Sequence, residues 1–308
     1  MFRLMLASHP RIGIPPETGF ILWLWWRWRT LSIMAADYER LVDDFLAQET
    51  APDLALEKSE LLEAFAQRGP RTFVDAMEVF YETYLGAVFP GKPRWGDKTT
   101  WYIDYIETLT ELFPGAKFIH LIRDGRDVLC SYRNTGFLPG RVSQVALTWR
   151  TRVRKGERVA RRLGEARWMN LRYEDLVQAP EPELTRVCEF LDETFHPDML
   201  DFWRDNQART LEPARHMAWK GRTVSPADPA SVGRWRRELE AREVARFEAL
   251  AGETLRRWGY DRSDEGPGPA RRVVGRASGA VFRAYWGVKL GTWPWRLRAR
   301  RWWEGRGS

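Results

Sequence analysis

The pattern of apolar and polar positions predicts many helices and two short strands. Residues 118–122 form a short, mostly apolar run with turn residues on both sides, which is typical of a strand buried on both faces of a parallel sheet. Residues 168–172 have the same character and predict a second strand. After the first strand, Val128, Leu129 and Tyr132 recur on one side of a helix. We therefore expect a strand, a tight turn and a helix between residues 118 and 133.

Most of the remaining chain has a helical spacing of apolar positions. Thr72 is expected to cap one of these helices, because a threonine hydroxyl accepts a hydrogen bond from a backbone N–H of the first turn. The polar stretch 207–229 contains Gly and Pro and is expected to be a mobile loop. The other expected helices cover residues 2–7, 20–33, 36–48, 54–66, 72–88, 103–113, 143–163, 181–191, 197–206, 241–251 and 255–258.

Composition and charge divide the chain at the Gly266-Pro-Gly-Pro269 cluster, which marks a linker. Residues 1–265 are long enough to bury a full core and are expected to form one domain. The net charge is +7, but residues 266–308 carry ten basic residues and one acid, so the rest of the chain is close to neutral. This distribution argues against nucleic acid as the main partner, since a nucleic-acid-binding domain carries its charge on the fold.

The basic tail 266–308 also holds five of the seventeen tryptophans. Basic residues interleaved with Trp suit contact with a membrane surface, and packing of the tail on its own domain is an equal alternative. The two cysteines, Cys130 and Cys188, are far apart and fit a reducing, cytoplasmic compartment. No spacing of His, Cys or acidic residues suggests a metal site, and no metal is expected.

A candidate binding site lies at the carboxyl end of the first predicted strand. Arg123 ends the strand and Ser131 lies on the following helix, at the sheet edge where open α/β sheets bind ligands. An arginine can bind a phosphate through two hydrogen bonds, and a serine hydroxyl can add another. A local ion pair between Arg123 and Asp127 that only holds the turn is an alternative. Spacing alone does not separate the two interpretations.

The segment from Arg123 to Val128, with Ser131 eight positions after Arg123, resembles the 3′-phosphate-binding motif of the sulfotransferases. These enzymes use 3′-phosphoadenosine 5′-phosphosulfate (PAPS) and release 3′-phosphoadenosine 5′-phosphate (PAP). The resemblance implies that Arg123 and Ser131 hold the 3′-phosphate. It also implies an α/β, P-loop-NTPase-like fold with a parallel sheet flanked by helices.

Further segments resemble the bacterial and tyrosyl-protein branches of this family. Residues 6–18 resemble the segment that follows the phosphate loop, so we expect the first strand and this loop to be absent from the chain as given, and translation to start upstream of Met1. Residues 95–99 resemble the family segment whose lysine, here Lys98, faces the sulfuryl group. Residues 172–176 resemble the segment whose tyrosine, here Tyr173, lies near the nucleotide.

A late stretch, residues 221–236, resembles the segment that covers the nucleotide. Lys220 and Arg222 are candidate phosphate contacts there, and a surface charge pair is the alternative for each. In the reaction, Lys98 would stabilise the leaving phosphate oxygen. Glu17 resembles the glutamate that serves as base, a role for which we expect partial burial to raise its pKa toward neutrality. A glutamate that stabilises the dipole of the helix after Thr18 is the alternative.

The sequence therefore predicts a PAPS-dependent sulfotransferase that transfers a sulfuryl group to a hydroxyl or amine. Its acceptor is left open among small molecules, carbohydrates, lipids and peptides. The alternative is a catalytically inactive remnant that acts as a binding or membrane-associated protein. A P-loop kinase relative is less favoured, since no Walker-type Gly-Lys-Thr/Ser loop is found.

Overall fold

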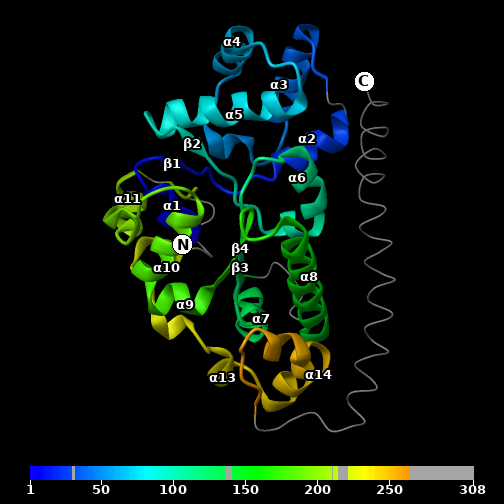
Figure 1. Cartoon of the computed structure of the whole chain (residues 1–308), viewed down its shortest axis with the longest axis vertical. Helices are drawn as coiled ribbons and strands as arrows, with labels where there is room; N and C mark the ends of the chain where they lie inside the picture. The colour runs from blue at the N-terminus through cyan, green and yellow to red at the C-terminus, as the bar shows by residue number, and fades with distance from the viewer. Residues whose placement is uncertain (30–31, 136–140, 210, 214–220, 264–308) are drawn as a thin grey trace. The chain divides into compact units, whose positions relative to one another are not determined.

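The computed structural model describes residues 1–29, 32–135, 141–209, 211–213 and 221–263 (Figure 1). The chain divides into two compact units, which are described separately. Unit 1 comprises residues 1–121 and 159–229, and unit 2 comprises residues 122–158 and the part of the chain from residue 230 onward. The whole basic tail 266–308 lies outside the described residues.

The first half of unit 1 alternates helices with two very short strands. Its regular elements are α1 (Phe2–Ala7), β1 (Ile12–Gly13), α2 (Phe20–Trp28), α3 (Tyr38–Leu46), α4 (Lys58–Arg68), α5 (Phe73–Val88), β2 (Arg94–Trp95) and α6 (Ile106–Leu112). The later elements of this unit are β4 (Trp168–Arg172), α9 (Tyr173–Gln178), α10 (Pro180–Phe190) and α11 (Phe202–Arg209).

Unit 2 is helical in its described part. It contains α7 (Gly125–Thr135), α13 (Trp235–Glu238) and α14 (Ala241–Arg257). Two elements run from one unit into the other, namely β3 (Phe118–Ile122) and α8 (Val142–Leu163).

Thr72 caps α5 as the sequence predicts. Its hydroxyl accepts a hydrogen bond from the Asp75 N–H at 3.1 Å, and the Asp75 carboxylate accepts one from the Thr72 N–H at 2.9 Å. This reciprocal arrangement satisfies two backbone donors that the first turn of a helix would leave unpaired. It fixes the start of the helix that carries Tyr81, a residue of the site described below.

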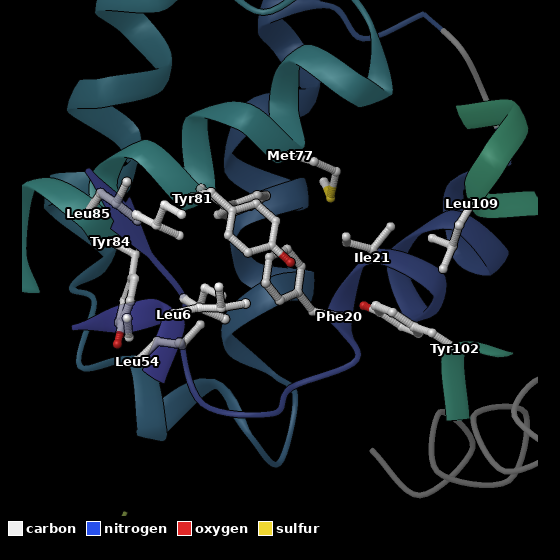
Figure 2. Packing of buried hydrophobic residues seen from close by; sticks show 14 of the residues in the cluster. Leu6, Phe20, Ile21, Leu54, Met77, Tyr81, Tyr84, Leu85, Tyr102 and Leu109 are labelled. Carbon is white, nitrogen blue, oxygen red and sulfur yellow. The ribbon is translucent and has the colours of Figure 1, made fainter. Parts of the chain in front are cut away.

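The core of unit 1 is rich in aromatic side chains. Phe45 stacks on Phe80 with ring centroids 4.3 Å apart, and Phe20 meets both rings edge to face. Phe20 also lies 4.9 Å from Tyr81, and Figure 2 shows these two rings side by side between α2 and α5. Offset and edge-to-face aromatic pairs add to the free energy gained from burial. These four rings therefore form a packed aromatic group in the core of unit 1.

Strands β1 and β2 form a parallel pair, with Ile12 opposite Arg94 and Gly13 opposite Trp95. Gly13 is favoured by close packing, because a Cβ atom at this position would lie 3.0 Å from Leu85 of α5 and from Phe89, the residue that follows this helix. Since the strands are parallel, the chain leaves both of them at the same edge. Residues 14–19 and 96–100 are thereby brought together.

The two strands predicted from the sequence, β3 and β4, have the predicted bounds and pair with each other. The prediction that β3 is buried on both faces is wrong. Ile122 is buried, but the residues before it are partly accessible, and Leu121 is 37% exposed. Within the described residues β3 has β4 as its only neighbouring strand.

Several helices differ from their predicted limits. α2 ends at Trp28, where Arg29 adopts a left-handed conformation with φ 43°, so it does not continue to residue 33. The expected helix 103–113 begins as a 3₁₀ segment, Thr100–Tyr105, and becomes α-helical only at Ile106. The expected helices 241–251 and 255–258 are one continuous helix, α14, because Gly252 and Glu253 remain helical in its interior.

Part of the predicted loop 207–229 is regular. Its described residues include the end of α11 and a 3₁₀ turn at Gly221–Val224. Within the part of the chain that the structure describes, no helix has the length and apolar character needed to cross a bilayer. Likewise, the described side chains include no group of three or more His, Cys, Asp or Glu residues arranged to hold a metal ion.

Candidate active site

Glu17 and Lys98 meet in unit 1. The Lys98 ammonium donates a hydrogen bond to Oε2 of Glu17, although the two residues are 81 positions apart. The contact follows from the β1–β2 pair, because Glu17 lies four residues beyond β1 and Lys98 three residues beyond β2 at the same sheet edge. The Glu17 and Lys98 side chains are 23% and 39% exposed, so a substrate can reach this ion pair.

The second carboxylate oxygen of Glu17 is held by Thr100. Oε1 accepts a hydrogen bond from the Thr100 N–H at 3.0 Å and another from the Thr100 hydroxyl at 2.7 Å. Glu17 therefore does not act on a helix dipole: α2 begins at Phe20, its N-cap is Gly19, and its first turn contains no acidic residue. The carboxylate is instead part of a cluster with Lys98 and Thr100.

The expected upward shift in the pKa of Glu17 is wrong. Burial does raise this pKa, but the positive charge of Lys98 and the hydrogen bonds from Lys98 and Thr100 outweigh burial. The net result is a pKa below the ordinary value of a glutamate. From the sequence, only the effect of burial on the pKa of Glu17 could be predicted. The proximity of Lys98 depends on the pairing of β1 with β2, which are far apart in sequence.

Asp97, next to Lys98, is a site residue that the sequence argument did not identify. It accepts hydrogen bonds from the hydroxyl of Tyr81 and from Oγ1 of Thr99, the latter at 3.0 Å. Burial raises the pKa of Asp97 to about 6, although both hydrogen bonds lower it. Asp97 lies within residues 95–99, the segment that resembles the family's lysine-containing segment, so the sequence did contain a signal for it. Tyr81 had no signal beyond its place in an amphipathic helix.

Arg123 lies in unit 2, directly after β3. Its Nη2 donates a hydrogen bond to the Ser231 carbonyl at 2.6 Å and lies 3.7 Å from Oδ2 of Asp127. Its own carbonyl accepts a hydrogen bond from the Trp149 indole at 2.9 Å. The Arg123 side chain is 18% exposed. A guanidinium in this setting has a fixed direction and retains an accessible part that can face a phosphate.

Asp127 does more than pair with Arg123. Its two carboxylate oxygens accept hydrogen bonds from the backbone N–H groups of Gly233 and Trp235, at 2.8 and 2.9 Å. The side chain is fully buried. Burial raises the pKa of Asp127, and the N–H donors and Arg123 oppose this rise. The ion pair with Arg123 exists, but the shorter contacts of Asp127 hold residues 233–235 to the start of α7.

The remaining predicted binding residues have varied positions. Ser131 is half-buried in the second turn of α7, on the same strand-turn-helix as Arg123. Tyr173 is the half-buried first residue of α9, immediately after β4. Arg222 belongs to the 3₁₀ turn Gly221–Val224, and its side chain lies outside the description. Lys220 lies outside the described residues.

The sequence model of the sulfotransferase family matches residues 1–198 of this chain. The chain belongs to the sulfotransferase family. The matched region includes Glu17, Lys98, Arg123, Ser131 and Tyr173. It ends before the late segment that contains Arg222 and Gly233.

Three relatives illustrate the range of this family. The protein-tyrosine sulfotransferase A of Caenorhabditis elegans is 28% identical over 55% of this chain and 45% of its own length. The omega-hydroxy-beta-dihydromenaquinone-9 sulfotransferase of Mycobacterium bovis is 28% identical over 55% of this chain and 42% of its own. The nodulation protein NoeE of Sinorhizobium fredii is 25% identical over 93% of this chain and 70% of its own. The chain thus spans less than half of the first two relatives.

Two solved sulfotransferase domains have the same fold. The domain from the olefin synthase of Synechococcus PCC 7002 superposes with a TM-score of 0.59 and 20% identity, covering 85% of this chain and 90% of the domain. The domain from the curacin biosynthetic pathway superposes with a TM-score of 0.56 and 17% identity, covering 85% of this chain and 93% of the domain. The predicted P-loop-NTPase-like α/β fold of the sulfotransferases is therefore confirmed.

Proposed function

We propose that this chain transfers a sulfuryl group from PAPS to a hydroxyl or amine acceptor. The observation that carries the proposal is the accessible contact between the Lys98 ammonium and the Glu17 carboxylate. Sulfuryl transfer, by analogy with phosphoryl transfer, needs reactants held in line, a cation at the leaving oxygen and a base at the attacking group. Lys98 and Glu17 supply the last two.

In the proposed step, the acceptor oxygen or nitrogen forms a bond to sulfur while the bond between sulfur and the 5′-phosphate oxygen breaks. The Lys98 ammonium stabilises the negative charge that develops on that phosphate oxygen. The Glu17 carboxylate takes the proton of the acceptor. The products are the sulfated acceptor and PAP, and no metal takes part.

The low pKa of Glu17 is consistent with the role of base. At neutral pH the group is already an unprotonated carboxylate. When Lys98 turns toward the leaving phosphate oxygen, Glu17 loses its main positive neighbour but remains buried, and burial raises its pKa. Glu17 thus becomes a stronger base when the donor is in place. Thr100 keeps the carboxylate in position during this change.

The nucleotide-binding roles remain those that the family resemblance implies. Arg123 and Ser131 would hold the 3′-phosphate, and Tyr173 would lie near the nucleotide. Lys220 and Arg222 would contact a phosphate from the late segment. The position of Arg123 after a strand, with a directed and partly accessible guanidinium, supports its part in this proposal.

The acceptor is proposed as a hydroxyl-bearing small molecule, carbohydrate, lipid or peptide. Two of the relatives carry names that specify protein tyrosine and a dihydromenaquinone as acceptors, so the family accommodates both a peptide and a lipid. We place the activity in the cytoplasm, since Cys130 and Cys188 are both free and buried and require no oxidising compartment. Contact of the tail 266–308 with a membrane surface stays a proposal that rests on its composition alone.

The test is a transfer assay with PAPS labelled in its sulfuryl group. Residues 1–308 are incubated with a phenol, a carbohydrate, a lipid alcohol and a tyrosine peptide, and the labelled product and PAP are measured. We expect label in at least one acceptor class and an equal amount of PAP. Lys98→Met should remove this transfer, whereas Lys58→Met, at an exposed lysine of the same unit, should not.

Nucleotide binding without label in any acceptor would refute the transfer reaction. That outcome would favour the alternative of an inactive member of the family that acts as a binding protein. Transfer that survives in Lys98→Met would refute the proposed role of the lysine and leave the family reaction standing.

A further inference from the structure

We propose that Tyr81 and Asp97 form a positioning pair that holds the Lys98 segment against Glu17. The inference rests on the proposed function and adds two residues to it. Neither residue is expected to touch the reacting atoms. Their role is to fix the direction of the groups that do.

Tyr81 contacts the segments of both proposed catalytic residues. Its ring stacks on Trp95 with centroids 4.1 Å apart and planes inclined by 2°, and Trp95 lies three residues before Lys98. The same ring lies 4.9 Å from Phe20, three residues after Glu17. Tyr81 is 1% exposed, and Figure 2 shows it deep in the core beside Phe20. One rigid side chain of α5 therefore packs against Trp95 at the end of β2 and Phe20 at the start of α2.

The hydrogen bonds of Asp97 fix the direction of the segment that carries Lys98. Its carboxylate accepts the hydrogen bond of the Tyr81 hydroxyl, which ties the chain beside Lys98 to α5. The other carboxylate oxygen accepts the hydroxyl of Thr99, the residue on the far side of Lys98. Lys98 thus stands between two residues whose side chains are joined. The next residue, Thr100, donates to Glu17, so the constraint reaches the base.

The charges around Asp97 make the pair sensitive to pH. Tyr81, Thr99, Glu17 and Lys98 face the Asp97 carboxylate, and Tyr102 lies close enough for its pKa to be raised by the negative charge of Asp97. Burial raises the pKa of Asp97 to about 6. Below that pH the carboxyl group is protonated and its two hydrogen bonds lose their charged acceptor. The transfer rate should therefore fall as the pH falls through about 6.

The experiment compares Tyr81→Phe with Tyr84→Phe. Both variants lose one buried hydroxyl from α5, but only Tyr81 bonds to Asp97. We expect kcat of Tyr81→Phe to fall about tenfold or more, because small displacements of catalytic groups are costly, while KM for PAPS stays within about twofold. The acidic limb of its pH profile should move to higher pH, since the lost hydrogen bond had lowered the pKa of Asp97. Tyr84→Phe should resemble the unmodified chain.

Asp97→Asn is the second variant and preserves the side-chain shape. Its kcat should fall similarly, and the acidic limb near pH 6 should disappear because the titrating group is gone. Suppose that in both Tyr81→Phe and Asp97→Asn kcat stays within about twofold and the acidic limb stays at the pH found for the unmodified chain. The positioning role is then wrong, while the proposed transfer reaction stands.

A measurement without turnover separates this inference from the proposed function. Carboxyl ¹³C NMR titrations give the midpoints of Glu17 and Asp97 in the free protein. In Tyr81→Phe we expect the Glu17 midpoint to rise, because Lys98 is no longer held against it, and in Tyr84→Phe we expect it to stay unchanged. An unchanged Glu17 midpoint in Tyr81→Phe would overturn the inference even if no transfer activity were found in the unmodified chain.

Discussion

At the scale of single residues, Glu17 shows that a neighbour can reverse the effect of burial. The side chain is largely enclosed, and enclosure alone raises the pKa of a carboxyl group. Lys98 and Thr100 stabilise the ionised form more than burial penalises it. The sign of the shift therefore depends on which side chain the fold places beside Glu17, and not on how deeply Glu17 lies.

Lys98→Met provides a direct test of this balance. Without the ammonium, burial is opposed only by the Thr100 hydrogen bonds, so the pKa of Glu17 should rise. Carboxyl ¹³C NMR measures this midpoint, and Lys58→Met is the control. A Glu17 midpoint that stays low in Lys98→Met would mean that Lys98 is not the group that sets it.

Arg123 is the residue on which nucleotide recognition depends in our proposal. Arg123→Ala should weaken binding of PAP by about 10- to 100-fold, since hydrogen bonds to charged groups contribute about 1.5–3 kcal/mol. Adenosine 5′-phosphate, which lacks the 3′-phosphate, should bind both forms equally. Isothermal titration calorimetry measures the affinity of both nucleotides. The matched control is Arg133→Ala, on the exposed side of α7.

If Arg123→Ala binds PAP as tightly as the unmodified chain does, the 3′-phosphate assignment fails. If Arg123→Ala weakens the binding of PAP and of adenosine 5′-phosphate equally, Arg123 stabilises the turn and does not recognise the 3′-phosphate.

At the scale of elements, Asp127 joins α7 to the segment before α13. Because its two oxygens accept N–H groups that lie 106 and 108 positions away, one side chain fixes the path of residues 233–235. Arg123 contacts the Ser231 carbonyl of the same segment. The late segment is therefore anchored from the strand-turn-helix, which connects the predicted nucleotide motif with the segment predicted to cover the nucleotide.

Asp127→Ala should lower the free energy of unfolding by about 2–4 kcal/mol, because the buried Trp235 N–H and the partly buried Gly233 N–H lose their acceptor. Hydrogen exchange should show faster exchange of the Gly233 and Trp235 amides than of amides in the interior of α14. Denaturant titration gives the stability, and Glu238→Ala, at a side chain 37% exposed, is the control and should cost far less. Unchanged exchange at Gly233 would contradict the anchoring role.

At the scale of the whole molecule, each of the two units has its own core, and each core includes a buried ion pair, Arg3 with Glu212 in unit 1 and Arg126 with Glu248 in unit 2. Unit 1 is held mainly by aromatic and aliphatic packing around Phe20, Phe80 and Tyr81. Unit 2 adds a buried ionic group to its apolar cluster. In it the Arg126 guanidinium, 1% exposed, donates to the carboxylates of Asp124 and Glu248 and stacks 3.7 Å from the Trp235 ring centroid.

Arg126→Met tests how far unit 2 depends on this buried charge. The substitution keeps side-chain volume but removes the buried guanidinium that contacts Asp124 and Glu248, and it leaves Glu248 with the longer contact to Arg262, at 3.5 Å, as its ion pair. Loss of one partner from a buried ionic group costs about 3–5 kcal/mol. Denaturant unfolding followed by Trp fluorescence measures the loss. Arg154→Met, which removes a partly exposed ion pair with Glu253, should cost less than about 1 kcal/mol. Equal stability of the two variants would show that the buried cluster contributes no more than a surface pair.

The sequence by itself determined the features that depend on near neighbours. The bounds of β3 and β4, the Thr72 cap and the strand-turn-helix around Arg123 were all predictable, because apolar periodicity and capping are set within a few residues. The family motifs added the residue types of the site and the fold class.

Only the tertiary structure decided which of these residues meet. The parallel pairing of β1 with β2 joins Glu17 to Lys98 across 81 positions and reverses the expected pKa shift of the base. The packing of α5 against the same segments brings Tyr81 to Asp97, and the fold of unit 2 brings Asp127 to Gly233. The physical reason is that local pattern fixes the direction of a side chain from its own element, whereas its electrostatic partners come from whichever distant segment packs beside it.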